Sequence, residues 1–168
     1  MSDDLEATSA PTIDAAHYRS VLGHFCTGIT IVTTVADGEP AGFTCVSFTS
    51  VSLDPPLVAF LAQTTSSTLP KIRSSGVFCV NVLSDAQETI CRSFAAKAVD
   101  KFQGIGWRPG ATGSPVLSEV LASIDCTVEA EQPAGDHILV LGRVVEMDAA
   151  RQGQPLLFYR GGYGRFEA

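Results

Sequence analysis

The chain has 168 residues, of which 45% are hydrophobic and 17% are charged, and its formal net charge is -7 at pH 7. This length predicts one domain, and this composition is that of a chain with a buried core rather than of a disordered one. The acidic balance argues against a nucleic-acid partner and against an anionic membrane surface, because phosphate-rich surfaces are bound by clustered lysine and arginine. A phosphorylated small ligand stays compatible with it, since such a ligand needs only one or two cations.

The N-terminal residues carry no cationic segment followed by an apolar stretch, so we expect no secretory signal. No apolar run approaches the length of a membrane span. The five cysteines are widely spaced and include no Cys-x-x-Cys pair, which is typical of reduced thiols. The three histidines lie far apart, in no metal-ligand spacing. We therefore expect a cytoplasmic protein without a structural metal or disulfide.

Apolar and β-branched runs separated by turn residues predict six strands. Asp37-Gly38 is a strong signal for a tight turn, so the first two strands should pair antiparallel. Three other segments begin with helix-capping residues. The expected strands cover residues 29–35, 41–48, 57–62, 77–83, 121–131 and 138–147. The expected helices run from Asp14 to Gly23, from Ser66 or Ser67 as N-cap to Gly76, and from the capping box of Ser84 and Gln87 to about Ala96.

The remaining segments are expected to be less regular. Residues 1–13 have the composition of a mobile leader. Residues 99–115 hold four glycines, Trp107 and Pro109 and should form a long irregular loop, and residues 161–164 should form a flexible tail. In the strand over 121–131, the alternation predicts that Asp125 faces solvent.

Short strands, tight turns and few helices favour a mainly β fold, a closed antiparallel barrel rather than a parallel sheet. No Gly-x-Gly-x-x-Gly motif lies between a strand and a helix, so a doubly wound dinucleotide-binding fold is not expected. Residues 14–168 are expected to form one domain.

The clearest chemical signal is residues 44–53, which we call the shelf. Its hydroxyl side chains supply hydrogen-bond donors and acceptors without charge, and its apolar residues anchor it to a core. Asp54-Pro55-Pro56 ends it, because proline has no N–H to donate to a central strand. Such a segment suits a flat, hydrogen-bonding cofactor such as a flavin. A serine- and threonine-rich edge strand and turn is the alternative interpretation.

A second signal lies in residues 66–68, which precede Lys71 by one helical turn. Hydroxyls, free backbone N–H groups and a cation together favour phosphate, and plain helix capping beside a solvated lysine is the alternative. His137 follows Asp136 directly, and neighbouring side chains in a turn seldom form a catalytic pair. The aromatic residues near irregular segments, Phe102 and Tyr163 among them, either pack in a core or stack on a nicotinamide or adenine ring.

Six motifs, in one order along the chain, resemble those of the short flavin reductases of two-component flavin-dependent monooxygenases. The motifs lie at residues 20–34, 42–56, 76–83, 101–104, 135–137 and 155–163. The resemblance implies an FMN-binding split barrel, a six-stranded antiparallel Greek-key-like barrel with short peripheral helices, usually a homodimer with flavin at the subunit interface. It implies that NADH, less often NADPH, delivers a hydride to FAD or FMN and that reduced flavin leaves for a separate oxygenase.

In such relatives the segment matching the shelf holds the flavin ring and ribityl chain, and the segment matching residues 66–71 lies near the phosphate. The histidine of the Gly-Asp-His motif and the tail tyrosine lie near the nicotinamide, so His137 is the catalytic candidate. The competing interpretation is a flavin-binding protein without turnover, or an oxidase with permanently bound FMN. The expected cofactor-binding residues are Thr44, Cys45, Val46, Ser47, Ser50, Val51, Ser52, Ser66, Ser67, Thr68, Lys71, Phe102, His137 and Tyr163.

Overall fold

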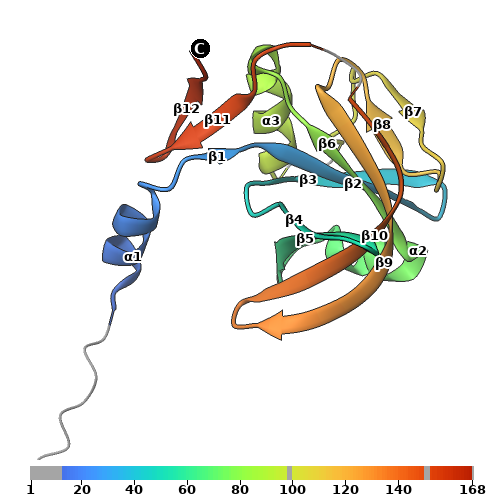
Figure 1. Ribbon diagram of the computed structural model, residues 1–168, viewed down its shortest axis with the longest axis horizontal. Coiled ribbons are helices and arrows are strands. Elements are labelled where there is room, and N and C mark those ends of the chain that lie inside the picture. Colours follow the sequence, from blue (N-terminus) through green and yellow to red (C-terminus); the bar gives the residue numbers. More distant parts are fainter. Residues whose placement is uncertain (1–12, 98–99, 150–151, 168) are drawn as a thin grey trace, which may run out of the picture.

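The computed structural model describes residues 13–97, 100–149 and 152–167. Its largest element is a seven-stranded sheet in which every neighbouring pair is antiparallel (Figure 1). The strand order is β3-β2-β6-β9-β10-β5-β4. The seven strands are β2 (Thr30–Ala36), β3 (Glu39–Cys45), β4 (Thr49–Leu53), β5 (Pro56–Gln63), β6 (Val77–Val82), β9 (Ala122–Ala134) and β10 (His137–Asp148). The expectation of a mainly β, antiparallel fold is confirmed.

All six expected strands lie in this sheet, and the seventh, β4, is formed by the shelf. The strand expected over residues 41–48 ends earlier, at Cys45, because the chain leaves β2 there and crosses to β5. β9 and β10 are longer than expected and are joined by a two-residue turn at Gly135 and Asp136.

The two edge strands of the sheet follow one another in the chain. β3 and β4 stand at opposite ends of the strand order, yet only residues 46–48 separate them. Ser47, in this link, accepts a hydrogen bond from the N–H of Leu61 in β5 (3.0 Å) and donates one to the carbonyl of Leu61 (3.2 Å). The sheet therefore curls until its edges meet.

The interior of the curled sheet is one apolar core. Side chains from six strands and one helix pack in it, and the rings of Phe60 and Phe78 meet edge to face at 5.0 Å. Burial of this apolar surface supplies most of the favourable free energy of folding. The core residues include Val32, Phe60, Leu69, Ile72, Phe78, Val80, Ile124, Cys126 and Val140.

Helix α2 (Leu69–Ser75) buries Leu69 and Ile72 in this core. Its N-cap is Thr68, not Ser66 or Ser67 as expected, and Ser66 instead accepts a hydrogen bond from the N–H of Thr68 (3.2 Å). That expectation was wrong because Thr68 is buried and bonds to β3, which fixes where the helix can begin. The helix ends at Gly76, whose φ of 70° is a left-handed conformation that favours glycine.

A second core lies under helix α3 (Glu88–Ala95), which follows the 3-10 turn η1 (Asp85–Gln87). The capping box of Ser84 and Gln87 is present, as expected. Cys91 and Phe94 face inward from α3, and the ring of Phe94 meets that of Phe102 edge to face at 5.0 Å.

Two small sheets lie outside the main one. β7 (Trp107–Pro109) and β8 (Pro115–Leu117) form a hairpin within the segment that was expected to be irregular. β1 (Thr27–Gly28), β11 (Leu156–Tyr159) and β12 (Gly162–Arg165) form a three-stranded sheet, so the expected flexible tail is in fact a strand. In both segments the glycines were interpreted as signs of irregular structure, whereas a local hairpin forms there, with Pro109 opposite Pro115 and Tyr159 opposite Gly162.

The β7–β8 hairpin also explains why Asp125 is buried (2% exposed) rather than facing solvent. Its carboxylate accepts hydrogen bonds from the N–H (2.7 Å) and the hydroxyl (2.6 Å) of Thr112, in the turn of that hairpin. Alternation along β9 predicts which face a residue lies on, and the hairpin covers the face that was expected to be solvated.

Helix α1 (Ala15–Leu22) stands apart from the main sheet, next to β1 (Figure 1). Asp14 caps it as expected, accepting hydrogen bonds from the N–H groups of Ala16 (2.9 Å) and His17 (2.8 Å). No residue of α1 is buried. The leader expected over residues 1–13 lies, apart from Ile13, outside the described residues.

Candidate functional site

A cavity of about 570 Å³ opens where β3, the start of α2 and the loop after α3 meet. Four of the expected cofactor-binding residues line it, from two segments far apart in sequence. Two lysines, Lys71 and Lys101, are among its lining residues, which favours an anionic ligand. The lining residues are Glu39, Pro40, Ala41, Gly42, Ser67, Thr68, Lys71, Asp100, Lys101 and Phe102.

Lys101 is the residue of this cavity that our sequence analysis missed. Its Nζ donates hydrogen bonds to the carbonyls of Phe94 (2.8 Å) and Gly42 (3.2 Å). Burial lowers the pKa of Lys101. The hydroxyl of Thr68 donates to the same Gly42 carbonyl (3.2 Å). The motif at residues 101–104 was visible in the sequence, but nothing local indicated that Lys101 would line the same cavity as Lys71.

The two carboxylates that line the cavity offset the positive charge of its two lysines only in part, because they are more exposed to water than the lysines are. Asp100 accepts a hydrogen bond from the N–H of Phe102 (3.0 Å), and both Asp100 and Glu39 are exposed. Lys71 and Lys101 are half-buried, so their charges are less screened by water.

The shelf divides into an inner and an outer part. In the inner part, Thr44 donates to the carbonyl of Cys91 (2.7 Å), and the thiol of Cys45 lies 3.2 Å from the hydroxyl of Ser47. Burial raises the pKa of Cys45, so this thiol stays neutral and is no nucleophile. The hydroxyls of the inner part therefore hold the fold together as well as lining the shelf.

The outer part is open to a ligand. Val46, Ser50 and Val51 are exposed and Ser52 is half-buried. The pairing of β4 with β5 shifts register between Ser50 and Ser52, which leaves Val51 outside the ladder. Apolar and hydroxyl groups thus alternate along an uncharged, largely exposed segment that pairs with β5.

The C-terminal end of β5 brings His137 close to the segment before α2. His137 pairs with Gln63, and the N–H and hydroxyl of Thr64 both donate to the carbonyl of Asp136 (3.0 and 3.1 Å). Leu61, the partner of Ser47, lies on the same strand. The inner shelf, His137 and residues 66–68 are therefore gathered around one strand end.

Tyr163 lies against α3 instead. Its hydroxyl accepts a hydrogen bond from the thiol of Cys91 (3.5 Å), and the guanidinium of Arg92 lies 4.5 Å from the centre of its ring. It approaches Thr44 only through Cys91, whose carbonyl Thr44 contacts. Within the described chain, no hydrogen bond or ring contact joins Tyr163 to His137.

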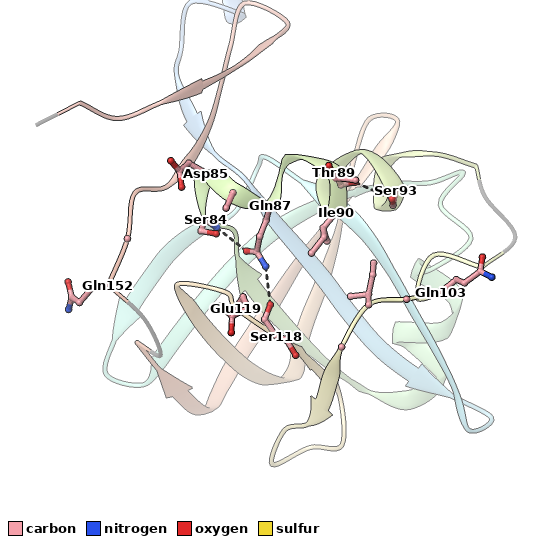
Figure 2. Close-up of a pocket in the computed structure, with 15 residues that line it drawn as sticks. Ser84, Asp85, Gln87, Thr89, Ile90, Ser93, Gln103, Ser118, Glu119 and Gln152 are labelled. Atoms are coloured by element: carbon pink, nitrogen blue, oxygen red, sulfur yellow. Dashed lines mark hydrogen bonds between the residues drawn. The ribbon is translucent and has the colours of Figure 1, made fainter.

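A second cavity, of about 670 Å³, lies against η1 and α3 and is lined by no expected residue (Figure 2). Gln87 spans its floor, accepting from the N–H of Ser84 (3.0 Å) and donating to the carbonyl of Ser118 (2.9 Å). Among the described residues that line it there are the acidic Asp85 and Glu119 but no lysine or arginine. This lining is unsuited to a phosphate, so the smaller cavity with the shelf is our candidate site.

Three further findings bear on the chemistry. In the described part of the chain, no cluster of histidine, cysteine, aspartate or glutamate could hold a metal ion. All five cysteines are free. No helix among the described residues is long and apolar enough to cross a membrane.

Comparison with known proteins gives consistent results. The sequence model of the flavin reductase like domain matches residues 22–167. The reductase subunit HsaB of a flavin-dependent monooxygenase from Rhodococcus jostii is 48% identical over 161 residues, which cover 96% of this chain and 83% of that protein.

Two solved structures are similar over nearly the whole chain. Nitrilotriacetate monooxygenase component B from Mycobacterium thermoresistibile has a TM-score of 0.88 and 47% identity, covering 90% of this chain and 86% of the other. The NADH:FAD oxidoreductase SgcE6 of Streptomyces globisporus, solved with NAD and FAD fragments, has a TM-score of 0.85 and 35% identity, covering 94% and 98% of the two chains.

Proposed function

Because the chain belongs to the flavin reductase like family, we propose that it is an NAD(P)H:flavin oxidoreductase that reduces FAD or FMN with NADH and passes the reduced flavin to a separate monooxygenase. The observation that carries the proposal is the cavity lined by Lys71, Lys101 and Thr68, together with the uncharged shelf that begins on β3 two residues after the cavity-lining Gly42. A cytoplasmic location, with NADH preferred over NADPH, belongs to the same proposal.

The residues present fit a flavin. Lys71, Lys101 and the hydroxyl of Ser67 would hold its phosphate, and Val46 and Val51 would lie against its ring. The hydroxyls of Ser50 and Ser52 would meet the polar edge of the ring or the ribityl chain. This set of donors is uncharged next to the ring and cationic next to the phosphate, which matches the two ends of the cofactor.

A bound flavin supplies a ring that accepts a hydride directly, so the protein needs no nucleophile and no metal. What the chain must do is hold two rings in stacked contact and place hydrogen-bond donors where negative charge grows. We assign the first task to the shelf together with His137 and Tyr163, which would position the nicotinamide. The second belongs to the N–H and hydroxyl groups of residues 44–52.

The proposed reaction predicts how the purified protein behaves. It should be nearly colourless and should consume NADH only after free flavin is added, because an open shelf exchanges its ligand. The measurement is the loss of NADH absorbance with and without added FAD, FMN or riboflavin. A protein that is purified yellow and oxidises NADH without added flavin would instead hold its FMN permanently and would contradict the proposal.

We also propose that the protein is a homodimer, which is supported by the exposed apolar face of α1. Tyr18, Val21 and Leu22 recur at helical spacing on α1, Phe25 follows in the turn after the helix, and each of the four is more than half exposed (52–77%). Helix α1 and the turn after it are held to the turn between β11 and β12 rather than to the main sheet, since the N–H of Arg160 donates to the carbonyl of Gly23 (2.9 Å). An apolar face of this kind marks a protein–protein contact, and we take its occupant to be a second copy.

Light scattering during gel filtration should therefore give the mass of a dimer. Placing two charges on the apolar face, with Val21→Asp and Phe25→Asp, should give a monomer, because burying an unpaired charge in an interface is costly. The matched control is Ala16→Asp with Ser20→Asp, which places the same charges on the other face of α1. A monomeric unchanged protein, or equal behaviour of the two variants, would rule out this interface.

A further inference from the structure

Asp136 and His137 form a hydrogen bond that neighbours in a turn seldom make. The Nδ1 of His137 lies 2.7 Å from Oδ1 of Asp136. An ionised carboxylate can only accept, so the proton of this hydrogen bond sits on Nδ1. The bond lowers the pKa of Asp136 and keeps its carboxylate ionised. The ring of His137 is 33% exposed, whereas the Asp136 side chain is 92% exposed.

The backbone that carries the pair is fixed. His137 lies between β9 and β5, opposite Gln63. The carbonyl of Asp136 accepts two hydrogen bonds from Thr64, and Gly135 has the positive φ of 66° that a two-residue hairpin turn requires. The carboxylate therefore reaches the ring without the entropic cost of ordering a loop.

The other ring nitrogen, Nε2, has no partner in the part of the chain that the structure describes. No hydrogen bond to Nε2 of His137 occurs within the described residues. With the proton held on Nδ1, the neutral ring presents Nε2 as an acceptor, and the partner that suits an acceptor is an amide N–H. The nicotinamide carboxamide offers such a group.

We infer that Asp136 is a positioning residue that fixes the tautomer and orientation of His137, so that Nε2 accepts a hydrogen bond from the nicotinamide carboxamide. The inference rests on the proposed role of His137 in nicotinamide binding. Without Asp136 the ring is free to carry its proton on Nε2, and an N–H then faces the N–H of the carboxamide. The hydrogen bond is lost although the histidine remains.

The tautomer can be measured independently of activity. In ¹⁵N NMR spectra of the full chain at roughly pH 8, above the usual histidine pKa of about 6.5, His137 should carry its proton on Nδ1. In Asp136→Ala the proton should move to Nε2, while Asp148→Ala, at the far end of the same strand, should leave the spectrum unchanged. The His137→Gln spectrum identifies the signal among the three histidines.

Kinetics test the consequence. Asp136→Ala should raise the half-saturating NADH concentration about tenfold, the equivalent of about 1.4 kcal/mol, with the flavin half-saturation unchanged. Loss of a negative charge would by itself favour the anionic NADH, so weaker binding cannot be a charge effect. In the His137→Gln background, Asp136→Ala should have no further effect, because Asp136 acts through the ring.

A proton on Nε2 in the unchanged protein, or a tautomer that stays the same in Asp136→Ala, would overturn the inference. An NADH effect of Asp136→Ala that persists in the His137→Gln background would overturn it as well. If the tautomer changes as expected but His137→Gln leaves the NADH half-saturation unaltered, the proposed role of His137 in nicotinamide binding is what fails, and the inference falls with it.

Discussion

Lys101→Met is expected to raise the half-saturating concentration of FMN by about 10- to 100-fold. A hydrogen bond to a charged group is worth roughly 1.5–3 kcal/mol, and each 1.4 kcal/mol is about tenfold. The ammonium of Lys101 is half-buried, and burial lowers its pKa, so a phosphate beside it is poorly screened by water. Methionine keeps most of the apolar stem and removes the charge. Steady-state NADH oxidation at varied FMN measures the change.

Two controls test whether the higher FMN requirement of Lys101→Met comes from a lost contact with the phosphate. Lys97→Met removes an exposed lysine from the segment just after α3 and should leave the FMN requirement unchanged. Riboflavin has no phosphate, so Lys101→Met should reduce riboflavin as well as the unchanged protein does. An equal loss with riboflavin would mean that Lys101 acts through its hydrogen bonds to Gly42 and Phe94, and no loss with FMN would place the phosphate elsewhere.

Gly142→Val should lower the free energy of unfolding by about 3 kcal/mol, at the upper end of what overpacking usually costs. A Cβ at Gly142 would overlap Cζ of Phe78 and lie 3.2 Å from the Cβ of Cys126. Phe78 is fully buried, and its ring already packs against Phe60, so it cannot move aside. Since 1 kcal/mol corresponds to about 2–4 °C at this chain length, the melting temperature should fall by about 6–12 °C.

The matched control is Gly28→Val in β1, where an added Cβ meets nothing within 4 Å. It should change the melting temperature little. Phe78→Leu should restore part of the stability in the Gly142→Val background, because it removes ring atoms from the side that the valine occupies. If Gly142→Val were as stable as Gly28→Val, the packing between β6 and β10 would be looser than described.

The sequence patterns predicted the regular elements well and their environment less well. Strands such as β2 and β6 are β-branched or apolar almost throughout, and Asp14 caps α1 as its residue type indicates. These are local effects. The burial of Asp125 depends on a hairpin that begins earlier in the chain, and the strand character of β12 depends on its pairing with β11. The first is not visible in a local window, whereas the second is a local hairpin whose glycines were interpreted as a flexible tail.

The candidate site shows the same division. Residue types in the shelf indicated uncharged hydrogen bonding, but not that the hydroxyls of Thr44 and Ser47 are already engaged with Cys91 and Leu61. The sequence indicated one cation near residues 66–68, and the fold adds Lys101 from a segment that no periodicity connects to it. The roles of the individual site residues remain predictions.

The curled sheet has a seam along the line where β3 gives way to β4. In the described strands, its two sides are joined through the Ser47 side chain rather than through a continuous ladder of backbone hydrogen bonds. Because no backbone ladder joins the strands along this seam, it should open locally more readily than the paired strands elsewhere. A ligand that lies over residues 46–52 would bridge that seam. Local opening there should therefore be less frequent in the ligand-bound protein than in the ligand-free protein.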